Sequence, residues 1–180
     1  MKSVLISIKP NWCELIASGK KTVEVRKTKP KLETPFKVYI YETNAYCWGI
    51  GKIYEDKRGK VIGEFLCDRI RCEKEVADGL VDVGLCATSC VSVKELIEYA
   101  NGKELYTWHI SDLKIYEKPR ELSEFKQVRL IRGYHKKDEP NPEGINIQAL
   151  LHSKRVEVKY FTRPPQSWCY VESENENGIK

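Results

Sequence analysis

Near the start of the chain Val4, Ile6 and Ile8 alternate with Ser3, Leu5 and Ser7. This two-residue period predicts a strand over residues 3–8. Pro10 suits the first turn of a helix, where its missing N–H is not needed. Gly19 is suited to end that helix in a left-handed conformation. A second alternation predicts a short strand over residues 22–26. Its two valines are expected on one face, with the polar side chains on the other: Thr22, Glu24 and Arg26.

The rest of the chain carries further strand patterns and one more helix. Ser92 and Glu95 form a capping box that opens a helix, which Asn101 and the following glycine close. Pro119 is expected to end the strand before it. Loop-like residues occupy 132–146. The expected strands cover residues 36–41, 61–70, 106–116, 156–161 and 164–171. Several short strands with few helices favour an α+β fold built on a small barrel or a strongly bent sheet.

A chain of 180 residues fits one domain, and we expect it to span residues 1–172 with a flexible tail over 173–180. No apolar run approaches the ~18 residues that cross a membrane. The apolar stretch at the N-terminus is too short for a secretory signal. These features predict a cytoplasmic protein with no membrane partner.

Seven cysteines in such a chain are expected to be reduced thiols. Four of them cluster in the sequence, but without the short C-x2-C spacing that most zinc sites show: Cys67, Cys72, Cys86 and Cys90. The three histidines, His109, His135 and His152, are not at metal-ligand spacing either. Buried thiols that pack as small apolar groups are therefore preferred over zinc, and we expect no metal and no cofactor.

Positive charge is gathered in two stretches of the chain. Residues 1–31 hold eight Lys and Arg against two Glu, a net +6, so the remaining residues sum to −1 of the total +5. Residues 126–137 add five Lys and Arg with no acid. Charge gathered in this way suits a polyanionic partner such as RNA. The alternative is a solvated basic face without a ligand.

The densest polar cluster runs from Gly19 to Arg26. A strand after the glycine presents Glu24 beside Arg26, with Lys21 at its start. Such a trio can accept a hydrogen bond from the amino group of a base while the cations hold a phosphate or a carbonyl. The alternative is an ion-paired strand face with a structural role.

The same segment resembles the ASCH domain family of the PUA-like superfamily. The resemblance rests on the sequence Lys9-Pro10-x-Trp12 and on the pattern Gly19-x-Lys21-x-x-Glu24-x-Arg26. A second match is Pro164-Pro165-Gln166-Ser167-Trp168-x-Tyr170, which is similar to the closing strand of the family. The resemblance covers roughly residues 3–126 and 162–172, and residues 127–161 look like an insertion.

That resemblance implies a PUA-like β-barrel flanked by short helices, with RNA or a nucleotide as the partner. It implies that Lys21, Glu24 and Arg26 form the floor of a cleft. Its rim would be formed by Lys9, Trp12, Gln166, Ser167 and Tyr170. With the neighbouring Lys20, Thr22 and Lys27, these residues make up the expected nucleic-acid-binding set. Cations for the backbone and flat rings for stacking are also what single-stranded RNA requires.

Two other functions stay open. Small proteins similar to this family are amidohydrolases that deacylate acetylated cytidine with a Lys, a Thr and a Glu, and others are linked to ribonuclease activity. The Lys matches Lys21, but the Thr falls at Glu24, where a carboxylate cannot act as a hydroxyl nucleophile. If the chain is a hydrolase, Lys21 and Glu24 are its expected catalytic residues. The third alternative is a protein-interaction module that uses some of the four tryptophans, of which we expect at least two to pack structurally.

Overall fold

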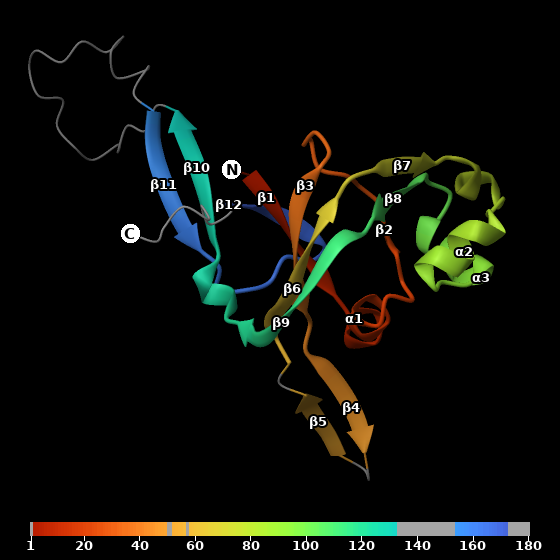
Figure 1. Ribbon diagram of the computed structural model, residues 1–180, viewed down its shortest axis with the longest axis horizontal. Coiled ribbons are helices and arrows are strands. Elements are labelled where there is room, and N and C mark those ends of the chain that lie inside the picture. Colours follow the sequence, from red (N-terminus) through yellow and green to blue (C-terminus); the bar gives the residue numbers. More distant parts are fainter. Residues whose placement is uncertain (1, 50–51, 57, 133–153, 173–180) are drawn as a thin grey trace, which may run out of the picture.

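The computed structural model of the protein describes residues 2–49, 52–56, 58–132 and 154–172 (Figure 1). Within these residues the largest sheet has five strands in the order β12-β1-β3-β6-β9. Strands β1 and β3 are parallel, and the other neighbours are antiparallel. The strands are β1 (Lys2–Ile8), β3 (Phe36–Glu42), β6 (Lys60–Cys67), β9 (Ser111–Arg120) and β12 (Trp168–Glu172).

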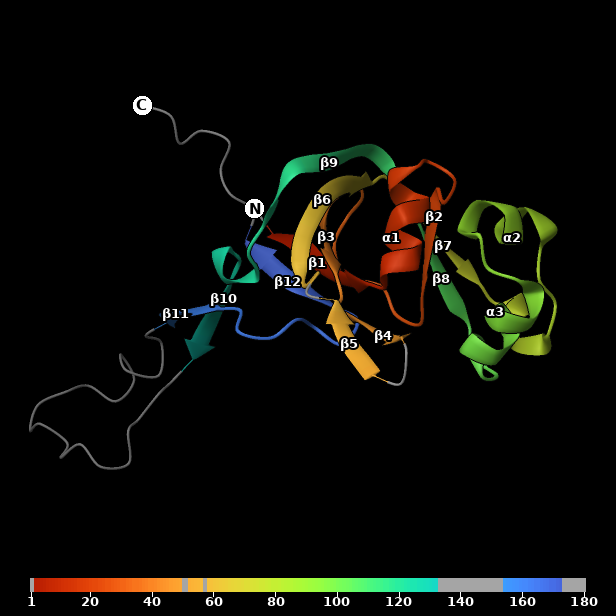
Figure 2. The same cartoon turned by 90° about the horizontal axis from the view of Figure 1, so that it is seen from below.

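Helix α1 (Pro10–Ala17) follows β1 and has the ends that the sequence predicts. Pro10 occupies the first turn, and Gly19 lies just past the helix with a φ of 72°. Its N–H donates to the carbonyl of Ile16 at 2.9 Å, which closes the last turn. Figure 2 shows α1 lying between the five-stranded sheet and strand β2.

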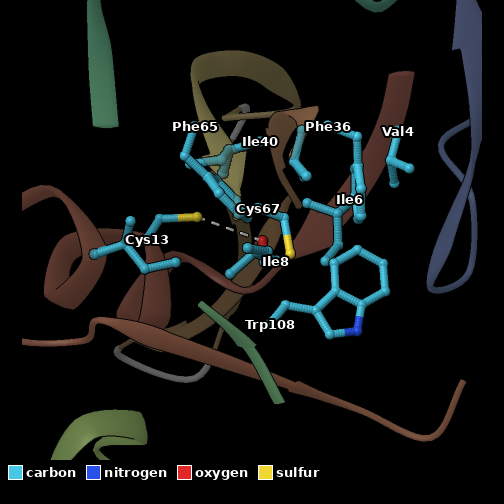
Figure 3. Packing of buried hydrophobic residues seen from close by; sticks show 11 residues of the cluster. Val4, Ile6, Ile8, Cys13, Phe36, Ile40, Phe65, Cys67 and Trp108 are labelled. Carbon is cyan, nitrogen blue, oxygen red and sulfur yellow. Dashed lines mark hydrogen bonds between the residues drawn. The ribbon is translucent and has the colours of Figure 1, made fainter. Parts of the chain in front are cut away.

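Strand β1 is buried on both faces because a hydrophobic cluster packs against each of them. Val4, Ile6 and Ile8 point into the main core, where α1, β3, β6 and β8 also contribute side chains (Figure 3). Leu5 points the other way, into a second cluster that includes Phe125. The predicted alternation of this strand is confirmed.

A smaller sheet has the order β2-β8-β7, with β2 (Val23–Arg26), β8 (Leu105–His109) and β7 (Ile70–Glu73). Trp108 on one of its faces is fully buried in the main core. Val25 and Leu105 on the other face pack against α2 (Val83–Ser89) and α3 (Val93–Ala100) in a third cluster. Figures 1 and 2 show these two helices on the far side of the small sheet from the five-stranded sheet.

Helix α3 has the predicted ends. The Ser92 hydroxyl accepts a hydrogen bond from the N–H of Glu95, and the Glu95 carboxylate accepts one from the N–H of Ser92. Asn101 closes the helix with a left-handed φ of 50°. The sequence analysis missed α2, strand β7 and the short 3-10 helix η1 (Glu75–Asp78).

The prediction of one long strand over residues 106–116 is wrong. The chain leaves the small sheet at Ile110, whose N–H donates to the carbonyl of Thr22 at 2.9 Å, and then enters the large sheet as β9. Pro119 lies inside β9 rather than after it. β9 is an edge strand. Proline is tolerated there because the outer side of an edge strand has no neighbouring strand that needs its N–H. The strand expected over 61–70 likewise ends at Cys67.

The fold is α+β, but the closed PUA-like barrel is not confirmed. Hydrogen bonds divide the described strands among separate sheets, and β9 and β12 are the edges of the largest one. None of the helices in the described ranges has both the length and the apolar character needed to cross a membrane.

Two hairpins complete the described structure. One pairs β4 (Ala45–Gly49) with β5 (Lys52–Asp56), and the other pairs β10 (Lys126–Arg132) with β11 (Lys154–Tyr160). A 3-10 helix, η2 (Leu122–Glu124), precedes β10. The β10–β11 hairpin falls in the expected insertion, and the Gln127 side chain donates to the Tyr170 carbonyl at 3.1 Å. Most of the expected 132–146 loop, His135, His152 and the expected tail lie outside the described residues.

The third cluster provides a test of how α2 and α3 are held on the small sheet. Leu105 is 0% exposed and Leu80 is 66% exposed. Leu105→Ala is expected to lower the free energy of unfolding by about 2–5 kcal/mol, because it leaves a cavity. Leu80→Ala should change it by less than about 0.5 kcal/mol. Urea denaturation measures both, and equal losses would contradict the packing described here.

Candidate nucleic-acid interface

Strand β2 points its charged side chains into a cleft. In the small sheet Glu24 lies opposite Trp108 and Arg26 opposite Tyr106, so their side chains face away from the third cluster. The cleft has a volume of about 470 Å³ and lies between α1, β2, α3 and residues 166–167. Its lining residues are Ser7, Ile8, Lys9, Trp12, Lys21, Glu24, Val25, Arg26, Thr43, Val91, Glu95, Leu96, Tyr99, Gln166 and Ser167.

A buried ion triad forms the floor of the cleft. Glu24 Oε2 lies 3.3 Å from Lys21 Nζ, and Glu24 Oε1 lies 3.0 Å from Arg26 Nε. The three side chains are 8%, 2% and 10% exposed, respectively. Charges so far removed from water interact strongly, and each of them depends on its partners.

Three contacts hold Lys21 at the floor of the cleft. Besides the ion pair with Glu24, its ammonium group donates to the carbonyl of Ser89 at 2.7 Å, at the end of α2. It also lies 5.1 Å from the centre of the Trp12 ring. Lys21 therefore holds the carboxylate of Glu24 in place.

Arg26 keeps spare donors. Its Nη2 donates to the carbonyl of Ser7 at 2.7 Å, and its Nη1 makes a longer contact of 3.4 Å with the Ser167 hydroxyl. Although Glu24 Oε1 is only 3.0 Å from Nε, the alignment is poor, and the buried Nε–H has no hydrogen-bond acceptor in good geometry. Each of the two Nη atoms carries a second N–H, so Arg26 can still donate to a carbonyl or phosphate oxygen in the cleft that it lines.

Two aromatic rings, of Trp12 on α1 and Tyr99 on α3, flank this charged floor. Burial raises the pKa of the Tyr99 hydroxyl, which therefore stays protonated and can donate a hydrogen bond. The ammonium of Lys27 lies 4.8 Å from the centre of the Tyr99 ring. Lys9 and Lys27 are exposed at the edge of the cleft, so their charges face water.

The structure brings most of the expected binding residues together. Seven line the cleft: Lys9, Trp12, Lys21, Glu24, Arg26, Gln166 and Ser167. Lys20 and Lys27 are exposed and do not line it, although Lys27 lies beside Tyr99 at its edge. Thr22 lines a different hollow, of about 310 Å³, on the side of the small sheet that α2 covers. The Tyr170 hydroxyl accepts a hydrogen bond from the N–H of Lys31 at 2.7 Å, and its ring packs on Trp168.

The contribution of α3 to the cleft was not predicted. Glu95, Leu96 and Tyr99 on this helix line the cleft, as does Val91 just before it. The capping box predicts the helix but not what it covers, because that depends on the packing of α3 against the small sheet. Ser7 and Thr43 were also missed, and they enter through the pairing of β1 with β3.

The cysteines and His109 have structural surroundings. Cys67 is buried in the main core, where burial raises its pKa to about 12. Cys72 is exposed and contacts Glu104, and Cys90 contacts the carbonyl of Lys20. His109 Nδ1 lies 2.7 Å from Asp68 Oδ1. Across the described residues, no three or more His, Cys, Asp or Glu side chains form a group that could hold a metal ion.

Comparison with known proteins gives the class of this α+β domain. The sequence model of the ASCH domain family matches residues 6–152, and the chain therefore belongs to this family. The match extends into the segment that the sequence analysis took as an insertion. No curated protein matches the chain.

Two solved structures show the same fold. The crystal structure of ASCH from Zymomonas mobilis has a TM-score of 0.59, with 20% identity over 94% of this chain and 87% of the other. A serine-to-alanine variant of the same protein has a TM-score of 0.55, with 20% identity over 94% and 88% of the two chains. At this level of identity the likeness extends to the fold alone.

The triad yields a stability prediction. Glu24→Ala leaves two buried cations without their carboxylate and is expected to lower the free energy of unfolding by about 3–5 kcal/mol. Glu98, whose carboxylate is 64% exposed and lies 3.8 Å from Lys94, is the matched control. Glu98→Ala should cost less than about 1 kcal/mol. Urea denaturation measures the free energy of unfolding of both variants. Similar losses would mean that hydration replaces the interactions of the triad.

Proposed function

We propose that the protein binds single-stranded RNA and holds one base in the cleft above Glu24. The observation that carries this proposal is a buried carboxylate at the floor of an open cleft, beside an arginine whose two Nη atoms each keep a second N–H. A volume of about 470 Å³ falls within the range of about 300–1,000 Å³ that small-molecule sites occupy.

The chemistry of the floor favours a base over a phosphate. A carboxylate repels phosphate but accepts hydrogen bonds from the amino group of a base, as Glu and Asp do from cytosine. Arg26 would donate to a carbonyl or a ring nitrogen of the same base. The rings of Trp12 and Tyr99 offer surfaces for stacking. Cytosine, adenine and guanine, which carry amino groups, should therefore bind better than uracil.

The backbone of the RNA would lie outside the cleft. Lys9 and Lys27 are exposed at its edge, and lysine binds phosphate as a point charge. Binding should weaken steeply as salt rises, because each phosphate contact releases counterions. The basic stretch over 126–137 is a further candidate, and its outer part lies outside the described residues.

Base preference tests the role of Glu24. Fluorescence anisotropy of labelled RNA should show tighter binding of an amino-bearing base than of uracil, by about 1–3 kcal/mol. Glu24→Gln should reduce that preference, because the amide offers one acceptor in place of two. Glu98→Gln, on the exposed face of α3, is the control. Unchanged preference in a folded Glu24→Gln protein would remove Glu24 from base recognition.

A hydrolase at the same cleft is the second candidate. Its supporting observation is that the hydroxyl-bearing Thr43 and Ser167 line the cleft together with Lys21 and Glu24. Thr22, the other hydroxyl near the motif, lines a different hollow.

Chromatography of acylated nucleosides and of labelled RNA tests this candidate. The hydrolase would be favoured if the wild-type protein shows turnover, Lys21→Ala abolishes this turnover and Lys94→Ala preserves it. Product formation no higher than in a blank, over several of these substrates, would exclude it.

A further inference from the structure

A further hollow, distinct from the cleft and from the one lined by Thr22, lies where β2 ends and β8 begins. The antiparallel register places Arg26 opposite Tyr106, so residues 27–29 lie beside residues 103–106, far away in the sequence. Together they form an open groove of about 490 Å³. Its lining residues are Lys27, Thr28, Lys29, Lys103, Glu104 and Tyr106.

The groove is strongly basic. It is lined by three lysines, and Glu104 is the single carboxylate among its lining residues. Glu104 already accepts hydrogen bonds from the Tyr106 hydroxyl and the Cys72 thiol, which lower its pKa. Within the described ranges, neither Lys29 nor Lys103 has a carboxylate close enough for an ion pair. Their positive charges are therefore available to a ligand.

Hydrogen bonds hold one wall of the groove in place. The indole N–H of Trp168 donates to the Thr28 hydroxyl at 3.0 Å, and the N–H of Lys31 donates to the Tyr170 hydroxyl at 2.7 Å. Lys29 Nζ lies 5.5 Å from the centre of the Tyr106 ring. Because these contacts order the segment before binding, a ligand does not have to meet that entropic cost.

The groove adjoins the cleft. Lys27 lines the groove, while its ammonium lies over the ring of Tyr99, which lines the cleft. Arg26 on the cleft floor is its neighbour in the chain. A strand with one base above Glu24 can therefore continue past Tyr99 into the groove.

The geometry points to a phosphodiester backbone as the occupant of this groove, so that the partner is a single-stranded polynucleotide rather than a free nucleotide. Lys29 and Lys103 bind its phosphates. This inference rests on the proposed function of the cleft. A groove lined by lysines suits a flexible, hydrated backbone, whereas the cleft, with its buried carboxylate, suits one base.

The experiment compares an RNA octanucleotide with the nucleoside 5′-monophosphate of the preferred base. Affinities come from anisotropy and calorimetry over a series of salt concentrations. The double variant Lys29→Met/Lys103→Met should lower the preference for the octanucleotide over the mononucleotide by at least about tenfold. It should also reduce the slope of log K against log salt by about 1.4, because two phosphate contacts are lost.

The matched control is Lys94→Met/Lys118→Met, which removes two exposed lysines that line neither hollow. If the control lowers the preference for the octanucleotide equally, the proposed role of the groove is wrong, because the effect then comes from the net charge of the protein. The groove variant could keep the wild-type preference for the octanucleotide and the wild-type salt dependence, while Glu24→Gln alters base preference. That result would refute the role of the groove and would still support base binding in the cleft. If the wild-type protein binds neither ligand, both proposals fail.

Discussion

The carboxylate of Glu24 joins parts of the chain that are far apart in sequence. Through Lys21 it is connected to the carbonyl of Ser89 at the end of α2, and through Arg26 to the carbonyl of Ser7 in β1. The large sheet, the small sheet and the helical layer therefore meet at one buried charge. Because each cation also bonds to a backbone carbonyl, its position is fixed before any ligand arrives, and the shape of the cleft follows from this network.

A buried ion triad is a costly way to stabilise a fold. Each charge loses its hydration, and apolar side chains of similar volume would often serve stability equally well. Arg26 also keeps a buried N–H without a well-aligned acceptor. A preorganised carboxylate and guanidinium at the base of an open cleft are, however, what recognition of a polar ligand requires. Under the proposed function, this cost serves binding rather than stability.

Within the described residues the chain crosses between the two sheets four times, and these crossings build the site. It passes from β1 to β2 and back to β3, and it crosses again between Cys67 and Ile70 and at Ile110. Gly63 allows β9 to lie close to β6, because a Cβ there would meet the Lys114 carbonyl at 2.5 Å. The small sheet packs against the main core through Trp108. Its outer face is covered by α2 and α3, and α3 also closes the cleft on one side.

Local patterns were enough to predict β1, α1, the capped helix α3 and the association of Glu24 with two cations, because strand alternation, capping and short charge spacings act between near neighbours. They could not predict that Tyr99 of α3 would line the cleft, or that Lys103 and Lys29 would line the same groove. They also missed the change of sheet at Ile110. These features depend on strand pairing between distant segments. A contact between residues so far apart leaves no periodic mark on the sequence around either of them.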